Sequence, residues 1–219
     1  MNRDLDEARQ RAENIRAHLP SSISIAALGV RSKTPYHLLA AREALIWRTE
    51  ELARCACDML ERDDLAAGSL LARAVTESAA FVWRLKELLE TRDQYTPEEL
   101  HDKFQRMFLG WKAKGDPDYP ESFNIVTLID HMDRKFPDVR DGYDHLSEFA
   151  HPNWSGVSGL FSSTDYDNYV SNFGRGLRQT EFPRTIACNL LVAALAVFQQ
   201  AYNSISDNLP GYLEELEPL

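Results

Sequence analysis

The chain has 219 residues, 44% of them hydrophobic and 26% charged, which suits one large domain or two small ones. A formal net charge of -10 argues against a standing non-specific grip on nucleic acid, which needs clustered Lys and Arg, and against an anionic membrane surface. No stable DNA binding is expected. A small basic pocket is still allowed. Cys55, Cys57 and Cys188 are too few and too irregularly spaced for a disulfide framework or a metal knuckle. With a charged N-terminus that lacks a signal segment, they favour a cytoplasmic location.

The first 33 residues are expected to form a peripheral segment. A charged stretch over residues 3–19 carries a thin apolar stripe at helical spacing and stops at Pro20, and residues 20–33 read as a connector. In residues 34–210, apolar positions recur as they do in long packed helices. We therefore expect one domain over residues 1–219, with the N-terminal helix on the surface of a bundle.

Two long helices open that bundle. Thr34-Pro35 supplies a capping oxygen and then a proline at the first helical position, and apolar residues recur every seven residues after it, which predicts a helix over 34–62. The next helix is expected over 65–90. Its core stripe would be Leu70, Ala74, Ser78, Phe81, Leu85 and Leu88. Because the break between the two helices is short, they should pack as an antiparallel hairpin.

The remaining elements are shorter until the end of the chain. A capping box at Thr96 to Glu99 opens a helix over 97–113. Further helices are expected over 125–136, 139–150 and 182–207, with a short one over 165–173 inside the Gly- and Ser-rich connection 152–181. From Ile186 to Phe198 only Asn189 is polar, so the last helix is predicted to be central, buried all round and too short to span a bilayer. Asn189 would then be a buried polar group. The plan is an all-α, single-domain bundle of about six main helices.

The densest group of reactive side chains lies in residues 143–156, YDHLSEFAHPNWSG. Pro152 disfavours helical geometry at His151, so the helix should end at Ala150. At ~100° per residue, Tyr143, Leu146, Phe149 and Ala150 share an apolar side of that helix. The opposite side carries Arg140, Asp144, Ser147, Glu148 and His151. That polar side is either a solvated surface or the wall of a cleft.

Arg73 and Glu77 flank the core stripe of the second long helix and are four residues apart, so their side chains can pair. A pair beside an apolar stripe would be partly buried. The pair is either a structural ion pair or part of a functional site. Its residue types do not distinguish the two, because structural pairs and functional sites both contain ionisable groups with shifted pKa values.

The segment from Arg140 to His145, within an α-helical bundle, resembles the HEPN superfamily, whose motif is Arg, four to six residues, then His. The resemblance implies a metal-independent ribonuclease or a defence- or toxin-related component. His145 would act as general acid and base, and Arg140 would stabilise phosphate charge. It also implies a homodimer, because the site in that superfamily usually forms across two copies, and RNA as the substrate. Arg11 to His18 and Arg31 to His37 fit the same loose motif.

A longer part of the segment, YxxLSEFxHPN, looks like uncharacterised bacterial helical proteins grouped distantly with that superfamily. An Arg-x3-Glu on an earlier helix often accompanies it there, and Arg73 to Glu77 fits. This resemblance moves the expected site to Arg73, Glu77 and His151, together with Tyr143 and Glu148. Arg140 and His145 are the rival set.

Two other classes of function are weighed beside a ribonuclease. Glu-x-x-His occurs at Glu98 to His101 and at Glu148 to His151, which a di-iron bundle would require, but the capping box explains Glu98. We expect neither a metal nor another cofactor. A non-catalytic interaction module with a protein partner is the second alternative. A nuclease needs a basic cleft, whereas an interaction module needs an exposed apolar patch.

Overall fold

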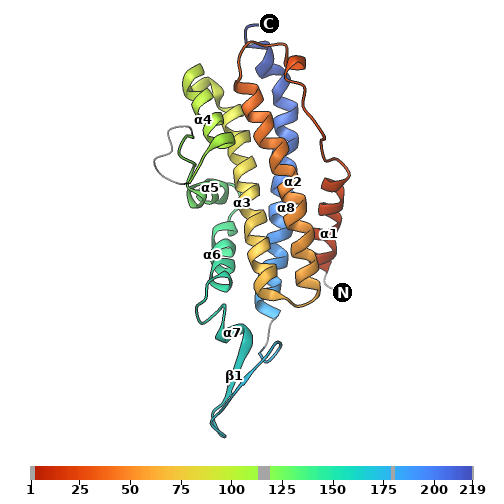
Figure 1. Ribbon diagram of the computed structural model, residues 1–219, viewed down its shortest axis with the longest axis vertical. Helices are drawn as coiled ribbons and strands as arrows, with labels where there is room; N and C mark the ends of the chain where they lie inside the picture. The colour runs from red at the N-terminus through yellow and green to blue at the C-terminus, as the bar shows by residue number, and fades with distance from the viewer. Residues whose placement is uncertain (1–2, 113–118, 179–180, 219) are drawn as a thin grey trace.

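The computed structural model describes residues 3–112, 119–178 and 181–218. It is predominantly α-helical, which confirms the predicted fold class (Figure 1). The α-helices are α1 (Arg3–Arg16), α2 (Thr34–Glu61), α3 (Leu65–Glu90), α4 (Pro97–Leu109), α5 (Ile125–Asp133), α6 (Val139–Ala150), α7 (Ser158–Phe161) and α8 (Glu181–Glu214). Two short 3-10 turns are η1 (Ala26–Leu28) and η2 (Arg92–Gln94). The bounds of α3 and α6 match the sequence prediction.

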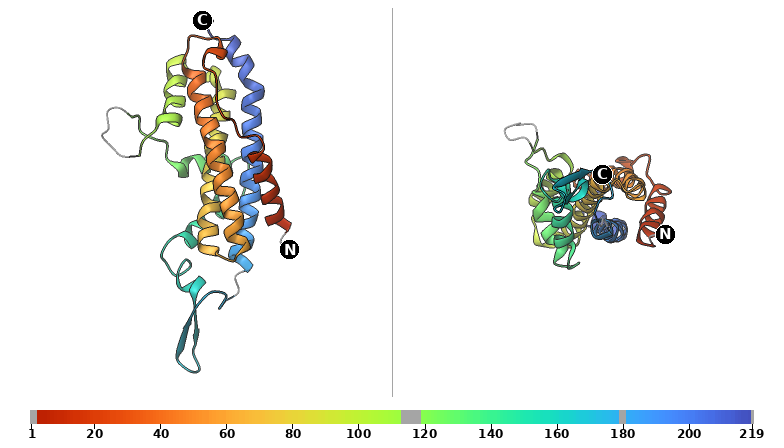
Figure 2. Two further views of the ribbon diagram at one scale, coloured as in Figure 1. Left: turned by 45° about the vertical axis from the view of Figure 1, so that its right-hand side comes forward. Right: turned by 90° about the horizontal axis from the view of Figure 1, so that it is seen from below.

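The centre of the bundle is α3, which packs against α2, α4, α5, α6 and α8. In Figures 1 and 2, α2 and α3 run antiparallel beside α8, and α4, α5 and α6 line the other side of α3. Ala72, Ala79 and Ala80 of α3 are fully buried. Because their side chains are small, the neighbouring helices can pack close to α3. The predicted helical hairpin is therefore confirmed. Its predicted core stripe is partly wrong, since Leu70 is 47% exposed.

The prediction for the last helix was wrong in three respects. Asn189 is exposed, because α8 is covered by α1, α2, α3 and α6 and leaves one side to solvent. The helix also continues past Pro210 to Glu214, so it is longer than expected. By length and composition alone α3 and α8 could each cross a membrane, so the expectation that the last helix is too short to span a bilayer is also wrong. Core helices of a bundle meet the same criterion, and about half of each such stretch is buried here.

Residues 162–173 form a β-hairpin and not the short helix expected there. Strand β1 (Ser162–Asp165) pairs antiparallel with β2 (Val170–Phe173), with Ser162 opposite Phe173. The carboxylate of Asp165 accepts hydrogen bonds from the backbone of Asp167 and Asn168 and so closes the turn. The hairpin extends beyond the end of the bundle (Figures 1 and 2).

Helix starts were predicted with mixed success. The capping box of Thr96 and Glu99 is present with both reciprocal hydrogen bonds. At α2 the capping residue is Lys33, with Thr34 already inside the first turn. The Thr34 hydroxyl lies 3.0 Å from Nδ1 of His101 on α4 instead. A side chain that can serve either a cap or a tertiary contact cannot be assigned from the sequence alone.

Candidate functional site

The polar cluster at the centre of the site joins α3 to α6. Arg73 and Glu77 lie one turn apart on α3, and Tyr143 reaches them from α6. Nη2 of Arg73 donates to the Tyr143 hydroxyl over 3.0 Å, and that hydroxyl donates to Oε1 of Glu77 over 2.9 Å. Nε of Arg73 lies 3.3 Å from the same carboxylate oxygen. The sequence analysis selected all three residues, and the structure brings them together.

Each member of the cluster constrains the others. The Tyr143 ring is buried at 3% exposure, and the Arg73 guanidinium lies over it, 5.0 Å from the ring centre. Burial, and then the negative charge of Glu77, raises the pKa of the Tyr143 phenol above its usual value, although Arg73 opposes the shift. Tyr143 therefore stays a protonated donor to Glu77 at neutral pH. Arg73 is held in one orientation by both partners.

An open cavity of about 840 Å³ lies against this cluster, between α2, α3 and the N-terminal end of α5. Arg48 of α2 and Lys112, which follows α4, line it together with Arg73, and among the described residues neither Arg48 nor Lys112 has an ion-pair partner. Phe81 and Phe123 supply aromatic surface. Glu77 and Glu121 are its acidic groups. The cavity thus combines aromatic rings with two cations, Arg48 and Lys112, that have no ion-pair partner within the described part of the chain.

The structure does not bring Arg140 and His145 together. Arg140 forms ion pairs with Asp130 and Asp144, which raise the pKa of its guanidinium. His145 is exposed, with Nδ1 2.8 Å from the Asp141 carbonyl oxygen and its ring against Phe182. Five residues along a helix separate two side chains by ~140°, so these two point to different surroundings. Arg140 already has two carboxylate partners.

Glu148 and His151 lie apart from the cluster of Arg73, Glu77 and Tyr143. His151 is exposed and follows the last residue of α6, eight residues beyond Tyr143, which is ~12 Å along the helix axis. Glu148 accepts a hydrogen bond from Nδ2 of Asn153. With His145 it lines a second cavity of about 330 Å³, beside Trp154 and Phe182. Of the five residues expected in the first set, three are therefore brought together.

The two Glu-x-x-His segments lie towards opposite ends of the bundle. His101 contacts Thr34 at the start of α2, whereas α6 ends near the other end of α2 (Figure 1). Among the described residues, no group of three or more His, Cys, Asp and Glu side chains is placed to hold a metal ion. The arrangement that a di-iron bundle requires is therefore not formed by these two motifs.

Arg48 and Lys112 are the cavity residues that sequence reasoning missed. Glu51 follows Arg48 by three residues on the same helix, a spacing that predicts a local ion pair and hides an unpaired cation. Lys112 lies far from α3 in sequence and reaches the cavity only through the packing of α4 and α5. Neither residue has a sequence signal that would have distinguished it.

No family model, no curated protein and no solved structure matches this chain.

Proposed function

We propose that this protein is an HEPN-like helical bundle that binds RNA in the cavity beside Arg73, Glu77 and Tyr143. The observation that carries the proposal is the set of three cations at one cavity, in a chain whose formal net charge is -10. A guanidinium held in a fixed orientation suits a phosphate group, because its planar donors match the phosphate oxygens. Arg73 is such a group, since Tyr143 and Glu77 both hold it.

The other cavity residues fit a single-stranded ligand. Arg48 and Lys112 would contact neighbouring phosphates, and Phe81 and Phe123 would stack against bases, which is the usual combination in proteins that bind single strands. The acidic remainder of the surface repels RNA, so binding would depend on this cavity alone and weaken steeply with added salt. A cytoplasmic location agrees with such a ligand.

The same groups would support metal-independent cleavage. Glu77 accepts the proton of a ribose 2′-hydroxyl, and the 2′-oxygen attacks the adjacent phosphorus while the bond to the 5′-oxygen breaks. The products are a 2′,3′-cyclic phosphate and a 5′-hydroxyl. Water supplies the proton to the departing oxygen, and the hydroxide so formed recovers the proton from Glu77. Arg73 stabilises the charge that develops on the phosphate.

Cleavage and binding of labelled transfer RNA and mixed cellular RNA test this proposal, with and without a chelator. We expect Arg73→Ala and Glu77→Gln to abolish cleavage, and Arg73→Ala to weaken binding. Arg84→Ala is the matched control, because Arg84 forms an ion pair with Glu87 on the same helix outside the cavity. If the folded wild type neither bound nor cleaved RNA, the proposal would be overturned. Loss of cleavage in His145→Ala alone would transfer the site to the Arg140 and His145 set.

A non-catalytic interaction module is the second candidate, and one observation favours it. Large apolar side chains are exposed on and around the β-hairpin. They are Trp154, Val157, Phe161, Tyr166, Tyr169, Val170, Phe173, Leu177 and Phe182. Exposed large apolar side chains in this number are typical of surfaces that contact another protein. If no RNA is bound, association with a protein partner through this surface is the function to test next.

A further inference from the structure

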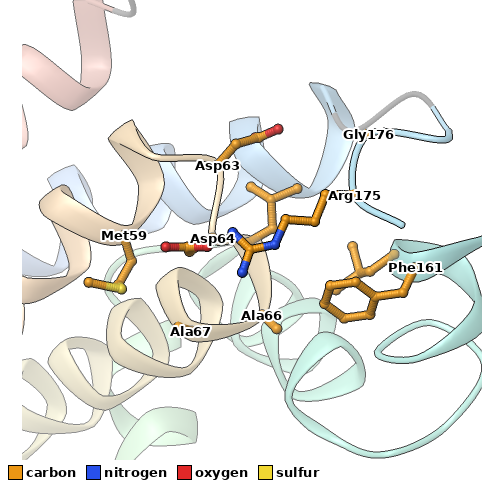
Figure 3. Close-up of a pocket in the computed structure, with 10 residues that line it drawn as sticks. Met59, Asp63, Asp64, Ala66, Ala67, Phe161, Arg175 and Gly176 are labelled. Carbon is orange, nitrogen blue, oxygen red and sulfur yellow. Dashed lines mark hydrogen bonds and ion pairs between the residues drawn. The ribbon is translucent and has the colours of Figure 1, made fainter. Parts of the chain in front are cut away.

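His37 of α2 is a titratable side chain in the core of the bundle. It is 8% exposed, and its Nδ1 atom is buried without a hydrogen-bond partner in the part of the chain that the structure describes. Charged groups just beyond the far end of α2 are paired, as Asp64 is with Arg175 beside a cavity of about 290 Å³ (Figure 3). No such ion pair offsets a charge on His37 among the described residues.

The ring of His37 packs among aromatic side chains where α2 meets α4. Its centre lies 5.0 Å from the ring centre of His101 and 6.0 Å from that of Phe108, which are two turns apart on α4. Tyr36 also contacts Phe108, with 5.8 Å between the ring centres. An uncharged imidazole behaves here as one more aromatic ring, so the contact between the two helices suits the neutral form of His37.

The charges around His37 disfavour a proton on its ring. Burial is the largest cause of a lowered pKa at His37, followed by the positive charges that His101 and Lys33 can carry. Lys33 lies one turn earlier on α2. Further titratable groups line a cavity of about 510 Å³ beside His101, and they are the acids Asp93, Glu98, Asp102 and Glu215, the phenols Tyr95 and Tyr212, and Arg92. Arg92 and Glu215 form an ion pair with each other.

A proton on His37 is costly only while α4 stays in contact with α2. An imidazolium carries a hydrogen on both ring nitrogens, so the buried Nδ1 would become a donor with no acceptor. The ring of His101 is held in place, because its Nδ1 lies 3.0 Å from the Thr34 hydroxyl. In a chain whose α4 has left α2, both histidines meet water and accept protons without this cost. Acid therefore favours the open form.

We propose that protonation of His37, beside His101, releases α4 from α2 in acid. The two histidines then act as a latch that is closed while both rings are neutral. In the closed form His37 holds its proton less tightly than an exposed histidine, which titrates near pH ~6.5. The closed form therefore has its full stability above about pH 6.5 and loses it as the pH falls.

Release of α4 would also change the candidate site. Trp111 follows the end of α4 by two residues, and its backbone forms hydrogen bonds with Pro120 and Ser122. Ser122 and Lys112 both line the cavity of about 840 Å³. When α4 leaves α2, this part of the cavity wall moves with it. The latch itself does not depend on whether the cavity binds RNA.

Hydrogen–deuterium exchange of the full chain at pH ~7.5 and pH ~5.0, corrected for the intrinsic effect of pH on exchange, tests the latch. We expect the protection of α4 to fall by about tenfold or more at the lower pH, as for one histidine that is protonated only in the open form. Protection of α3 should change far less, because α3 stays packed against α2 and α8.

Variants at His37 separate the latch from other effects of acid. His37→Phe keeps an aromatic ring in the contact and removes the titrating group, so α4 should stay protected at both pH values. His37→Leu is a second variant that cannot titrate, for use if circular dichroism shows that the phenylalanine variant is misfolded. His18→Phe is the matched control, because His18 is exposed beyond the end of α1, and it should keep the acid response.

Three results would overturn the proposal. The first is a wild-type α4 that stays protected at pH ~5.0. The second is the same loss of protection in a folded His37 variant, which would assign the response to another group. The third is an equal loss in every helix, which would indicate unfolding of the whole bundle and not the release of α4.

Discussion

At the scale of single residues, the Tyr143 hydroxyl connects two helices. It bridges Arg73 and Glu77. These two side chains also contact each other directly, with 3.3 Å between Arg73 Nε and Glu77 Oε1. We expect Tyr143→Phe to lower the free energy of unfolding by about 1–2 kcal/mol, the loss of hydrogen bonds to charged partners. Urea denaturation measures it. Tyr36→Phe is the matched control and should cost less than about 0.5 kcal/mol, since the Tyr36 ring makes only ring contacts among the described residues.

Buried tyrosine hydroxyls also make the folded state less stable at high pH. Burial raises the pKa of Tyr143, and raises that of Tyr212 to about 12. The folded state holds these protons more tightly than the unfolded chain, whose tyrosines titrate near pH ~10. This stability is therefore complete below about pH 10 and is lost as the pH rises through the folded-state values.

Phenolate absorbance and circular dichroism, recorded on one sample against pH, check the alkaline prediction. Ionisation of the late tyrosines should coincide with loss of helix. Tyr212→Phe should make stability fall less steeply above pH ~10. If all eight tyrosines of the chain titrated together near their ordinary pKa with the helices intact, the prediction would be wrong.

At the scale of elements, the α2–α3 hairpin depends on a close contact at Gly68. A methyl group there would lie 2.6 Å from Cδ2 of Leu60, whose side chain is fully buried. Gly68→Ala should therefore destabilise the fold by about 1–2 kcal/mol, because overpacking outweighs the better helix propensity of alanine. Gly211→Ala meets nothing within 4 Å in α8. That variant should gain up to about 1 kcal/mol, and equal effects at both sites in chemical denaturation would contradict this account.

At the scale of the whole molecule, the helical bundle and the β-hairpin of residues 162–173 are expected to be separable. The core is built from α1 to α8, and its large buried side chains include Phe104, Phe198 and Leu191, whereas β2 is exposed throughout. Replacement of residues 163–172 by a short Gly-Ser linker should leave the helix content unchanged. The free energy of unfolding should change by less than about 1 kcal/mol, because surface changes away from the core have small effects. Urea denaturation is the measurement. A loss of several kcal/mol would show that the β-hairpin contributes to the core.

Part of the candidate site could be predicted from the sequence. Spacing placed Arg73 and Glu77 beside the apolar stripe of α3 and Tyr143 on the apolar side of α6, and such stripes meet in the core. The resemblance carried by YxxLSEFxHPN and Arg-x3-Glu joined the three residues into one expected site. His151 was selected with them from the same segment. It lies ~12 Å farther along the axis of α6 than Tyr143, because the packing of α6 against α3 decides which turn of α6 faces Glu77. Arg48 and Lys112 reach the cavity only because of how α2, α4 and α5 pack against α3.

The sequence by itself determined the main helices and where most of them begin, because periodicity, prolines and the Thr96 capping box act over a few residues. Several ends were predicted wrongly, since α4 ends at Leu109 and α5 at Asp133, earlier than expected. Only the tertiary structure decided that α3 is the central helix, that Asn189 faces solvent and that residues 162–173 form a hairpin. Those outcomes depend on which apolar faces meet and which are left uncovered. That choice is made by contacts between segments far apart in the chain, and no local pattern records it.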